Sequence, residues 1–203
     1  MSDSALASGQ LPIWIKLLYT LFVCALIPIY WAKYGPANFL WFSDIALLTL
    51  VAALWLENSF LASMMALAVL GPEIAWNLDF IGRLMIGGKT GGLSGYMFNS
   101  GIPLYLRLLS LFHVVLPALL VWLMVRLRYD RRALVAQILV ALVVLPVSYL
   151  VSPPSTNINW VYGFGGQQQR LPPLVYLGVL MVLFPLVLYL PTHWVLLRFF
   201  GRP

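Results

Sequence analysis

Six long apolar stretches make up most of this chain, and each approaches the roughly 20 residues that a helix needs to cross a lipid bilayer. The stretches run over residues 12–31, 38–56, 59–82, 103–127, 133–151 and 173–200. In a bilayer the backbone can satisfy its polar groups only in helices or in a closed barrel, and these stretches lack strand-like alternation. The sequence therefore predicts an all-α, polytopic transmembrane helix bundle of about six spans, with residues 1–203 forming a single domain.

The composition supports the same class and excludes others. Hydrophobic residues make up 62% of the chain and charged residues 9%, whereas an average soluble domain has about 25% charged residues. The net charge is +6, but the basic residues lie mainly in short connections between apolar stretches. We therefore expect the lipid bilayer to surround the protein and expect no nucleic-acid partner. A cofactor, a metal and the oligomeric state are not indicated by any motif.

The basic residues also predict an orientation. With six spans, one side of the membrane carries seven of the twelve Lys and Arg residues: Lys16, Arg126, Arg128, Arg131, Arg132, Arg198 and Arg202. Short loops rich in Lys and Arg stay in the cytoplasm. We expect both termini to be cytoplasmic and the membrane to be a bacterial inner membrane. Two longer connections, over residues 83–102 and 152–172, then face outward.

Several polar residues interrupt the apolar stretches at a similar depth. An ionisable group inside a span is costly and usually marks a functional site. The depths of Asp44, Glu73 and His113 place all three in the outer half of the bundle. The sequence therefore predicts an outward-facing pocket with four candidate catalytic residues, which are His113, Asp44, Glu73 and Ser43. Four further residues are expected to line it: Asn77, Arg107, Ser110 and Trp160. The alternative is purely structural, with Asp44 paired to Arg107 so that both charges are satisfied.

Three short motifs resemble one known family. The segments YGPANFLWFSDIALL, LSLFHVVLP and WVY occur in the order and topology of the FAR-17a (androgen-induced) family of six-span membrane hydrolases. This resemblance implies a hydrolase in which His113 is the essential histidine. The threonine nucleophile of that family falls on Trp41, and Ser43 lies about 160° around a helix from that position. The nucleophile is therefore not matched, and Asp44 falls where the family has a polar, Asn-like residue.

Three functions remain open from the sequence. The first is a lipid-directed hydrolase or transferase acting on a lipid-like small molecule. In it, His113 is the general base, oriented by Asp44 or Glu73, and the nucleophile is Ser43, Ser110 or a water; the carboxylate and histidine groups could instead hold a metal. The second is a small transporter or proton-coupled carrier that relays protons through these groups. The third is a non-catalytic membrane subunit or assembly factor with a structural polar cluster.

Overall fold

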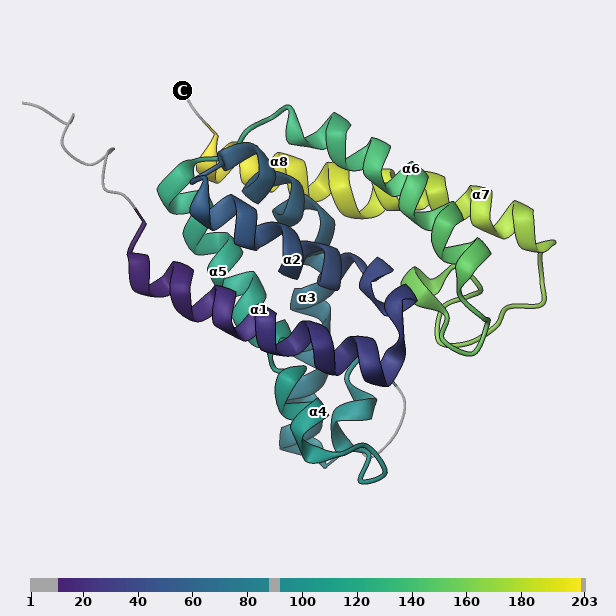
Figure 1. Cartoon of the computed structure of the whole chain (residues 1–203). Coiled ribbons are helices and arrows are strands. Elements are labelled where there is room, and N and C mark those ends of the chain that lie inside the picture. The colour runs from purple at the N-terminus through teal and green to yellow at the C-terminus, as the bar shows by residue number, and fades with distance from the viewer. Residues whose placement is uncertain (1–10, 88–91, 202–203) are drawn as a thin grey trace, which may run out of the picture.

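The computed structural model describes residues 11–87 and 92–201, and the regular elements among these residues are all helical. In chain order they are α1 (Ile13–Tyr34), η2 (Pro36–Leu40), α2 (Phe42–Trp55), α3 (Ser59–Ile86), η3 (Gly95–Phe98), α4 (Leu104–Leu109), α5 (Phe112–Leu127), α6 (Ala133–Val151), η4 (Ile158–Trp160), α7 (Pro173–Leu183), the π-helical η5 (Phe184–Tyr189) and α8 (Leu190–Phe200). The predicted all-α bundle is confirmed (Figure 1).

Within the described residues, five stretches are both long and apolar enough to cross a membrane: α1, α3, α4 with α5, α6, and α7 through α8. The remaining expected span, residues 38–56, is a helix in two pieces, because the extended backbone of Trp41 separates η2 from the 14-residue α2. The structure gives α2 alone as an apolar helix of 14 residues, which is shorter than the roughly 20 residues that a span needs.

Large apolar side chains cover the outside of the bundle. Leu18 on α1, Val143 on α6 and Leu174 on α7 are each exposed by 60% or more. A soluble protein rarely exposes continuous apolar surface of this kind. The chain is therefore a multi-pass membrane protein whose outer surface contacts lipid.

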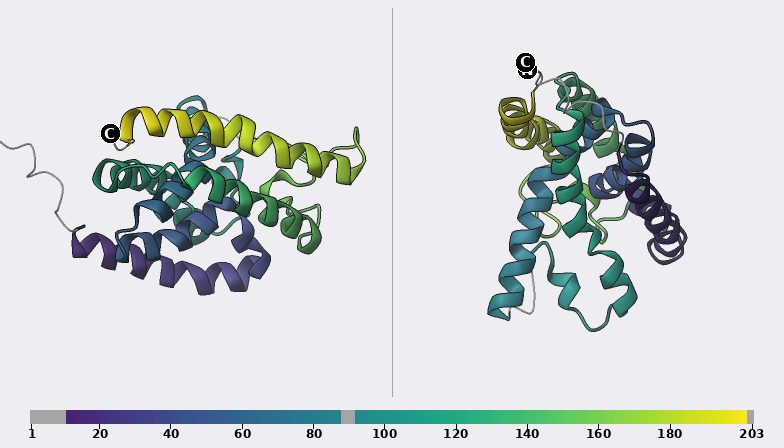
Figure 2. Two further views of the ribbon diagram at one scale, coloured as in Figure 1. Left: turned by 90° about the horizontal axis from the view of Figure 1, so that it is seen from above. Right: turned by 90° about the vertical axis from the view of Figure 1, so that its left-hand side faces the viewer.

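Helix α3 lies at the centre of the bundle and packs against α2, α5 and α6 (Figures 1 and 2). Every residue from Ala62 to Leu70 is buried. Small residues among them, Ala62, Ala66 and Ala68, let the neighbouring backbones approach closely, which is how helices associate in the absence of a hydrophobic driving force. The residues that follow this buried segment, Glu73 among them, therefore belong to a helix that several neighbours hold in place.

The start of α1, the turn at 56–58, the loop at 128–132 and the end of α8 meet at one end of the bundle, here called the basic end. Lys16 forms an ion pair with Glu57 at 2.8 Å. The backbone N–H of Tyr129 donates to the carbonyl of Phe200. The hydrogen bond that Lys16 donates to Glu57, together with the ion pair between them, holds the pKa of the Glu57 carboxyl below its ordinary value.

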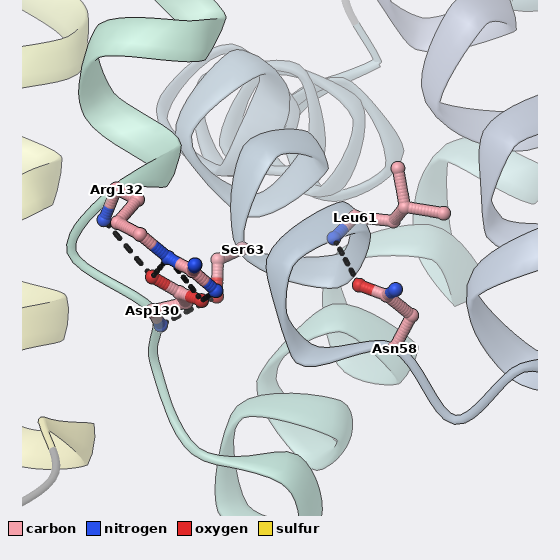
Figure 3. A network of polar contacts seen from close by, with 5 residues as sticks. All are labelled: Asn58, Leu61, Ser63, Asp130 and Arg132. Carbon is pink, nitrogen blue, oxygen red and sulfur yellow. Dashed lines mark hydrogen bonds and ion pairs between the residues drawn. The ribbon is translucent and has the colours of Figure 1, made fainter.

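Polar side chains at the basic end also fix the start of α3, as Figure 3 shows. Asn58 accepts a hydrogen bond from the Leu61 N–H at 3.0 Å, which caps the helix. Ser63 accepts the N–H of Asp130 at 2.9 Å, and Asp130 in turn pairs with Arg132 at 2.7 Å. The contacts of Asn58 and Ser63 each satisfy a backbone N–H, and the N–H of Leu61 in the first turn of α3 would otherwise lack a partner.

Candidate functional site

A pocket of about 630 Å³ lies between α1, α2, α3 and α5, in the half of the bundle away from the basic end. The short helices η3 and η4 contribute Tyr96 and Trp160 to its wall. Six of the residues predicted for the site line it: Ser43, Asp44, Glu73, Ser110, His113 and Trp160. The structure therefore brings together groups that come from three different spans and a loop.

The centre of the pocket is a carboxylate and an imidazole in direct contact. Both carboxylate oxygens of Glu73 lie 2.9 Å from Nδ1 of His113. The Glu73 side chain is 3% exposed and that of His113 is 16% exposed. An ionised carboxylate can only accept, so with Glu73 ionised the donor of this contact is the Nδ1–H of His113. In the neutral ring this leaves Nε2 as the proton-accepting nitrogen, and Nε2 makes no hydrogen bond to the residues that the structure describes.

The backbone around this pair explains why α3 and α5 are held in register. Pro117 has no N–H, so it cannot bond the carbonyl of His113 one turn earlier. The side-chain amide of Asn77 donates to that carbonyl at 2.7 Å and also to the carbonyl of Glu73 at 2.8 Å. Asn77 thus ties both members of the pair together through their backbones. It lies behind the pocket wall and not in it.

Aromatic rings fix the plane of the imidazole. The ring of Trp76 stacks on His113 with centroids 4.8 Å apart and an interplanar angle of 25°. On the sequence-adjacent side, Phe112 lies 4.1 Å from His113 at 29°. A ring held between two others has little freedom to rotate, so the direction of Nε2 is defined before any ligand binds.

The span that carries His113 is broken just before it. The turn at Ser110 and Leu111 separates α4 from α5, where a continuous helix over residues 103–127 was predicted. Ser110 Oγ donates to the Leu106 carbonyl at 3.0 Å and lies 3.0 Å from the hydroxyl of Tyr30. The Ser110 hydroxyl is therefore occupied in holding the break and does not touch His113.

Asp44 lies in the pocket wall but has a different partner from the one expected. Its Oδ2 accepts a hydrogen bond from the Asn38 amide at 3.1 Å, and its buried Oδ1 has no hydrogen-bond partner. The pairing of Asp44 with Arg107, the structural alternative, does not occur in the described part of the chain. Arg107 is not among the residues that line the pocket and donates to the Met97 carbonyl at 3.2 Å. Burying a carboxylate oxygen without a partner is costly.

The loop after α6 closes one side of the pocket with unusual backbone geometry. Asn157, Asn159 and Trp160 all have positive φ, at 45°, 52° and 58°. The Asn159 side chain accepts from the Phe42 N–H and donates to the Leu40 carbonyl, which bridges the gap between η2 and α2. Such conformations persist only where surrounding contacts hold them, and they are concentrated at binding sites.

Sequence reasoning missed several pocket residues, namely Tyr30, Asn38, Trp76 and Tyr96. Trp76 had a usable signal, because it lies three residues after Glu73 and so shares its helix face. Tyr96 had none, because its position depends on how the loop before α4 folds back. Burial raises the pKa of the Tyr96 phenol, so this side chain presents a neutral hydroxyl.

No group of three or more His, Cys, Asp or Glu side chains that could hold a metal ion occurs in residues 11–87 and 92–201. Comparison of the chain with protein-family models, with curated proteins and with solved structures gave no match.

Proposed function

We propose that this protein is a lipid-directed hydrolase or transferase in which His113 is the general base and Glu73 orients it. The observation that carries the proposal is the contact of both Glu73 oxygens with Nδ1 of His113 inside a buried pocket. A carboxylate on one imidazole nitrogen fixes the tautomer and stabilises the imidazolium that forms during proton transfer. The resemblance to the FAR-17a hydrolases, which was drawn from the sequence, points to the same histidine.

The proposed reaction moves one proton through Nε2 of His113. A water, or the hydroxyl of an acceptor molecule in a transferase, gives its proton to Nε2 as its oxygen bonds to the ester carbonyl carbon. The tetrahedral intermediate then expels the alcohol, and this leaving oxygen takes the proton back from Nε2. Atoms balance with water or the acceptor alcohol as the only co-reactant.

We favour a water or acceptor hydroxyl over a serine of the chain as the nucleophile. The Ser110 hydroxyl is held by the Leu106 carbonyl and by Tyr30. Ser43 lines the pocket but makes no hydrogen bond to His113. A serine nucleophile needs its base within hydrogen-bond reach, although apo geometries are often loose. Ser43→Ala should therefore retain activity.

An apolar groove supports a lipid as the substrate. It has a volume of about 320 Å³, lies between α1 and α5, and includes Trp14, Leu18, Val115 and Phe112 in its wall. Phe112 also lines the pocket and is the residue before His113. A lipid chain lying in this groove would bring its ester past Phe112 to the imidazole.

A proton-coupled carrier is the second candidate. The observation that favours it is the presence of Asp44, Glu73 and His113 in one pocket within the spans, because chains of such groups relay protons in pumps and transporters. A carrier would move a solute across proteoliposomes in response to a pH gradient, and a hydrolase would not.

The deciding experiment offers medium- and long-chain lipid esters to the purified protein in detergent and in nanodiscs, and follows release of the acid or alcohol. We expect turnover by the wild type and its loss in His113→Ala. Equal inertness of the two proteins across the panel would discard the hydrolase proposal. Proteoliposome flux would then separate a carrier from a non-catalytic subunit or assembly factor.

We also propose six crossings of a bacterial inner membrane with both termini in the cytoplasm. The clustering of Lys16, Arg126, Arg132 and Arg198 toward the basic end supports this orientation. In a Cys24→Ser background, cysteines placed at the exposed positions Arg131 and Gln169 test it. An impermeant thiol reagent added to intact cells should label position 169 and spare position 131, and the reverse pattern would overturn the orientation.

A further inference from the structure

The pocket has an aromatic wall of unusual extent. Three tryptophans, three tyrosines and three phenylalanines line it. Trp41 and Trp160 meet at 79° with centroids 6.3 Å apart, and Tyr30 meets Tyr34 at 88° and 5.3 Å. Both pairs are in edge-to-face contact. The faces of Trp and Tyr rings carry negative electrostatic potential and attract cations.

The pocket contains two acidic side chains in addition to these rings. Asp44 and Glu73 both line it, and none of the lining residues that the structure describes is Lys or Arg. Glu73 is engaged with His113, but Asp44 receives only the amide of Asn38 and keeps Oδ1 without a partner. Asp44 is 3% exposed and forms part of the pocket wall. The pocket is therefore complementary to a positive charge.

We propose that the pocket binds an alkylated or primary ammonium group, with Asp44 as its counter-charge and Trp41, Trp160 and the tyrosines as its walls. An aromatic cage beside a carboxylate recognises such groups because they are positively charged, and the alkylated ones are in addition large and weakly hydrated. A phosphate or carboxylate group would meet two carboxylates and no described basic residue in the wall. The bearer of the ammonium group is either a lipid headgroup or a free amine.

The inference rests on the proposed function in that it names the part of the substrate that the pocket holds. Its test measures binding and not turnover, so failure of the cation site and failure of the enzyme proposal are distinguishable. A protein that binds ammonium compounds but cleaves no ester keeps this inference and loses the other.

The experiment uses the full chain in a maltoside detergent, which carries no ammonium group. Choline and tetramethylammonium are titrated against 3,3-dimethyl-1-butanol, the neutral carbon isostere of choline, with calorimetry and tryptophan fluorescence as readouts. We expect choline to bind at least tenfold more tightly than its isostere. Equal affinities for the two would overturn the proposal without the need for any variant.

Variants then assign the site. Asp44→Asn should lower choline affinity at least tenfold and leave isostere binding unchanged. Trp41→Leu should lower choline affinity about 2- to 30-fold, the range of a cation–aromatic contact. Asp130→Asn, at the opposite end of the bundle, is the matched control and should bind choline as the wild type does. A preference for choline that survives Asp44→Asn in a protein that unfolds normally would overturn the assignment.

The two bearers of the ammonium group are separated in nanodiscs. Choline binding is compared in discs of phosphatidylglycerol alone and in discs that also contain phosphatidylethanolamine or phosphatidylcholine. Weaker apparent binding of choline in the mixed discs identifies a lipid headgroup as the occupant. Unchanged binding identifies a free amine. Absence of choline binding in both kinds of disc and in detergent overturns the proposal.

Discussion

Both the pocket and the basic end contain two carboxylates and one histidine, which makes them a natural pair to compare. At the basic end Glu57 accepts from Lys16 and from the Leu11 N–H, and Asp130 pairs with Arg132. His193 there meets the hydroxyl of Tyr129 at 2.6 Å. The polar groups of this end are joined to partners that tie one connection of the chain to another.

The pocket uses the same residue types differently. Its histidine is paired with the carboxylate of Glu73 and not with a phenol. Its second carboxyl group, Asp44, lines a pocket of about 630 Å³ and has one buried oxygen without a partner. A fold selected for stability alone would pair that oxygen or replace the residue. The difference is the one expected if the basic end serves the fold and the pocket, as proposed, serves a ligand.

Replacing the two histidines should give the largest difference in turnover between the two regions. His113→Ala removes the proposed general base and should lower turnover by about 10²- to 10⁴-fold. His193→Ala is the matched change at the basic end and should leave turnover within a factor of about three, because it removes only the Tyr129 contact. Ester hydrolysis by the two purified variants checks this. Comparable losses in both would remove the distinction between the two regions.

Substitution of one carboxylate in each region should have the next largest effect on the rate. Glu73→Gln preserves shape but removes the charge that stabilises a protonated His113, and loss of such a partner typically costs 10- to 100-fold. The expected signature is a lower rate with little change in KM. Asp130→Asn should change neither kcat nor KM. If Asp44→Asn impairs the rate more than Glu73→Gln does, then Asp44 and not Glu73 is the orienting group.

Stability should move in opposite directions in the two regions. Asp44→Asn removes a buried carboxylate that lacks a full set of partners and should raise the unfolding temperature in detergent by about 2–4 °C, the shift expected for 1 kcal/mol in a chain of this size. Glu57→Gln weakens an ion pair that is partly exposed and should lower it by about 1–3 °C. Thermal unfolding followed by intrinsic fluorescence measures both. A loss of stability in Asp44→Asn would mean that Asp44 serves the fold.

The smallest effect is a pH dependence confined to the basic end. The folded state holds the pKa of Glu57 below its ordinary value of 4.5, chiefly through the hydrogen bond from Lys16. Its contribution to stability is therefore complete above that ordinary value and is lost as the pH falls through the lowered one. The difference in unfolding temperature between wild type and Glu57→Gln should shrink below pH 4.5. Ser43→Ala removes no titratable group, so the difference in unfolding temperature between this variant and wild type should not change with pH.

The sequence alone determined the fold class and the residues worth attention. Apolar stretches of about 20 residues leave only helices as spanning structures, and the cost of ionisable groups in a span singles out Asp44, Glu73 and His113. These conclusions depend on local composition and on the intrinsic chemistry of each residue, which a linear reading contains.

Only the tertiary structure decided which of these groups touch. Depth along a span follows from residue number, but the direction of a side chain depends on how far each helix is rotated and where it is interrupted. The fourth span is interrupted at Ser110 and Leu111; Arg107, before the interruption, contacts the Met97 carbonyl, and His113, after it, contacts Glu73. Such breaks and rotations arise from packing among residues distant in the chain, such as Tyr30 with Ser110 and Asn159 with Phe42. Those contacts have no signature in the local sequence.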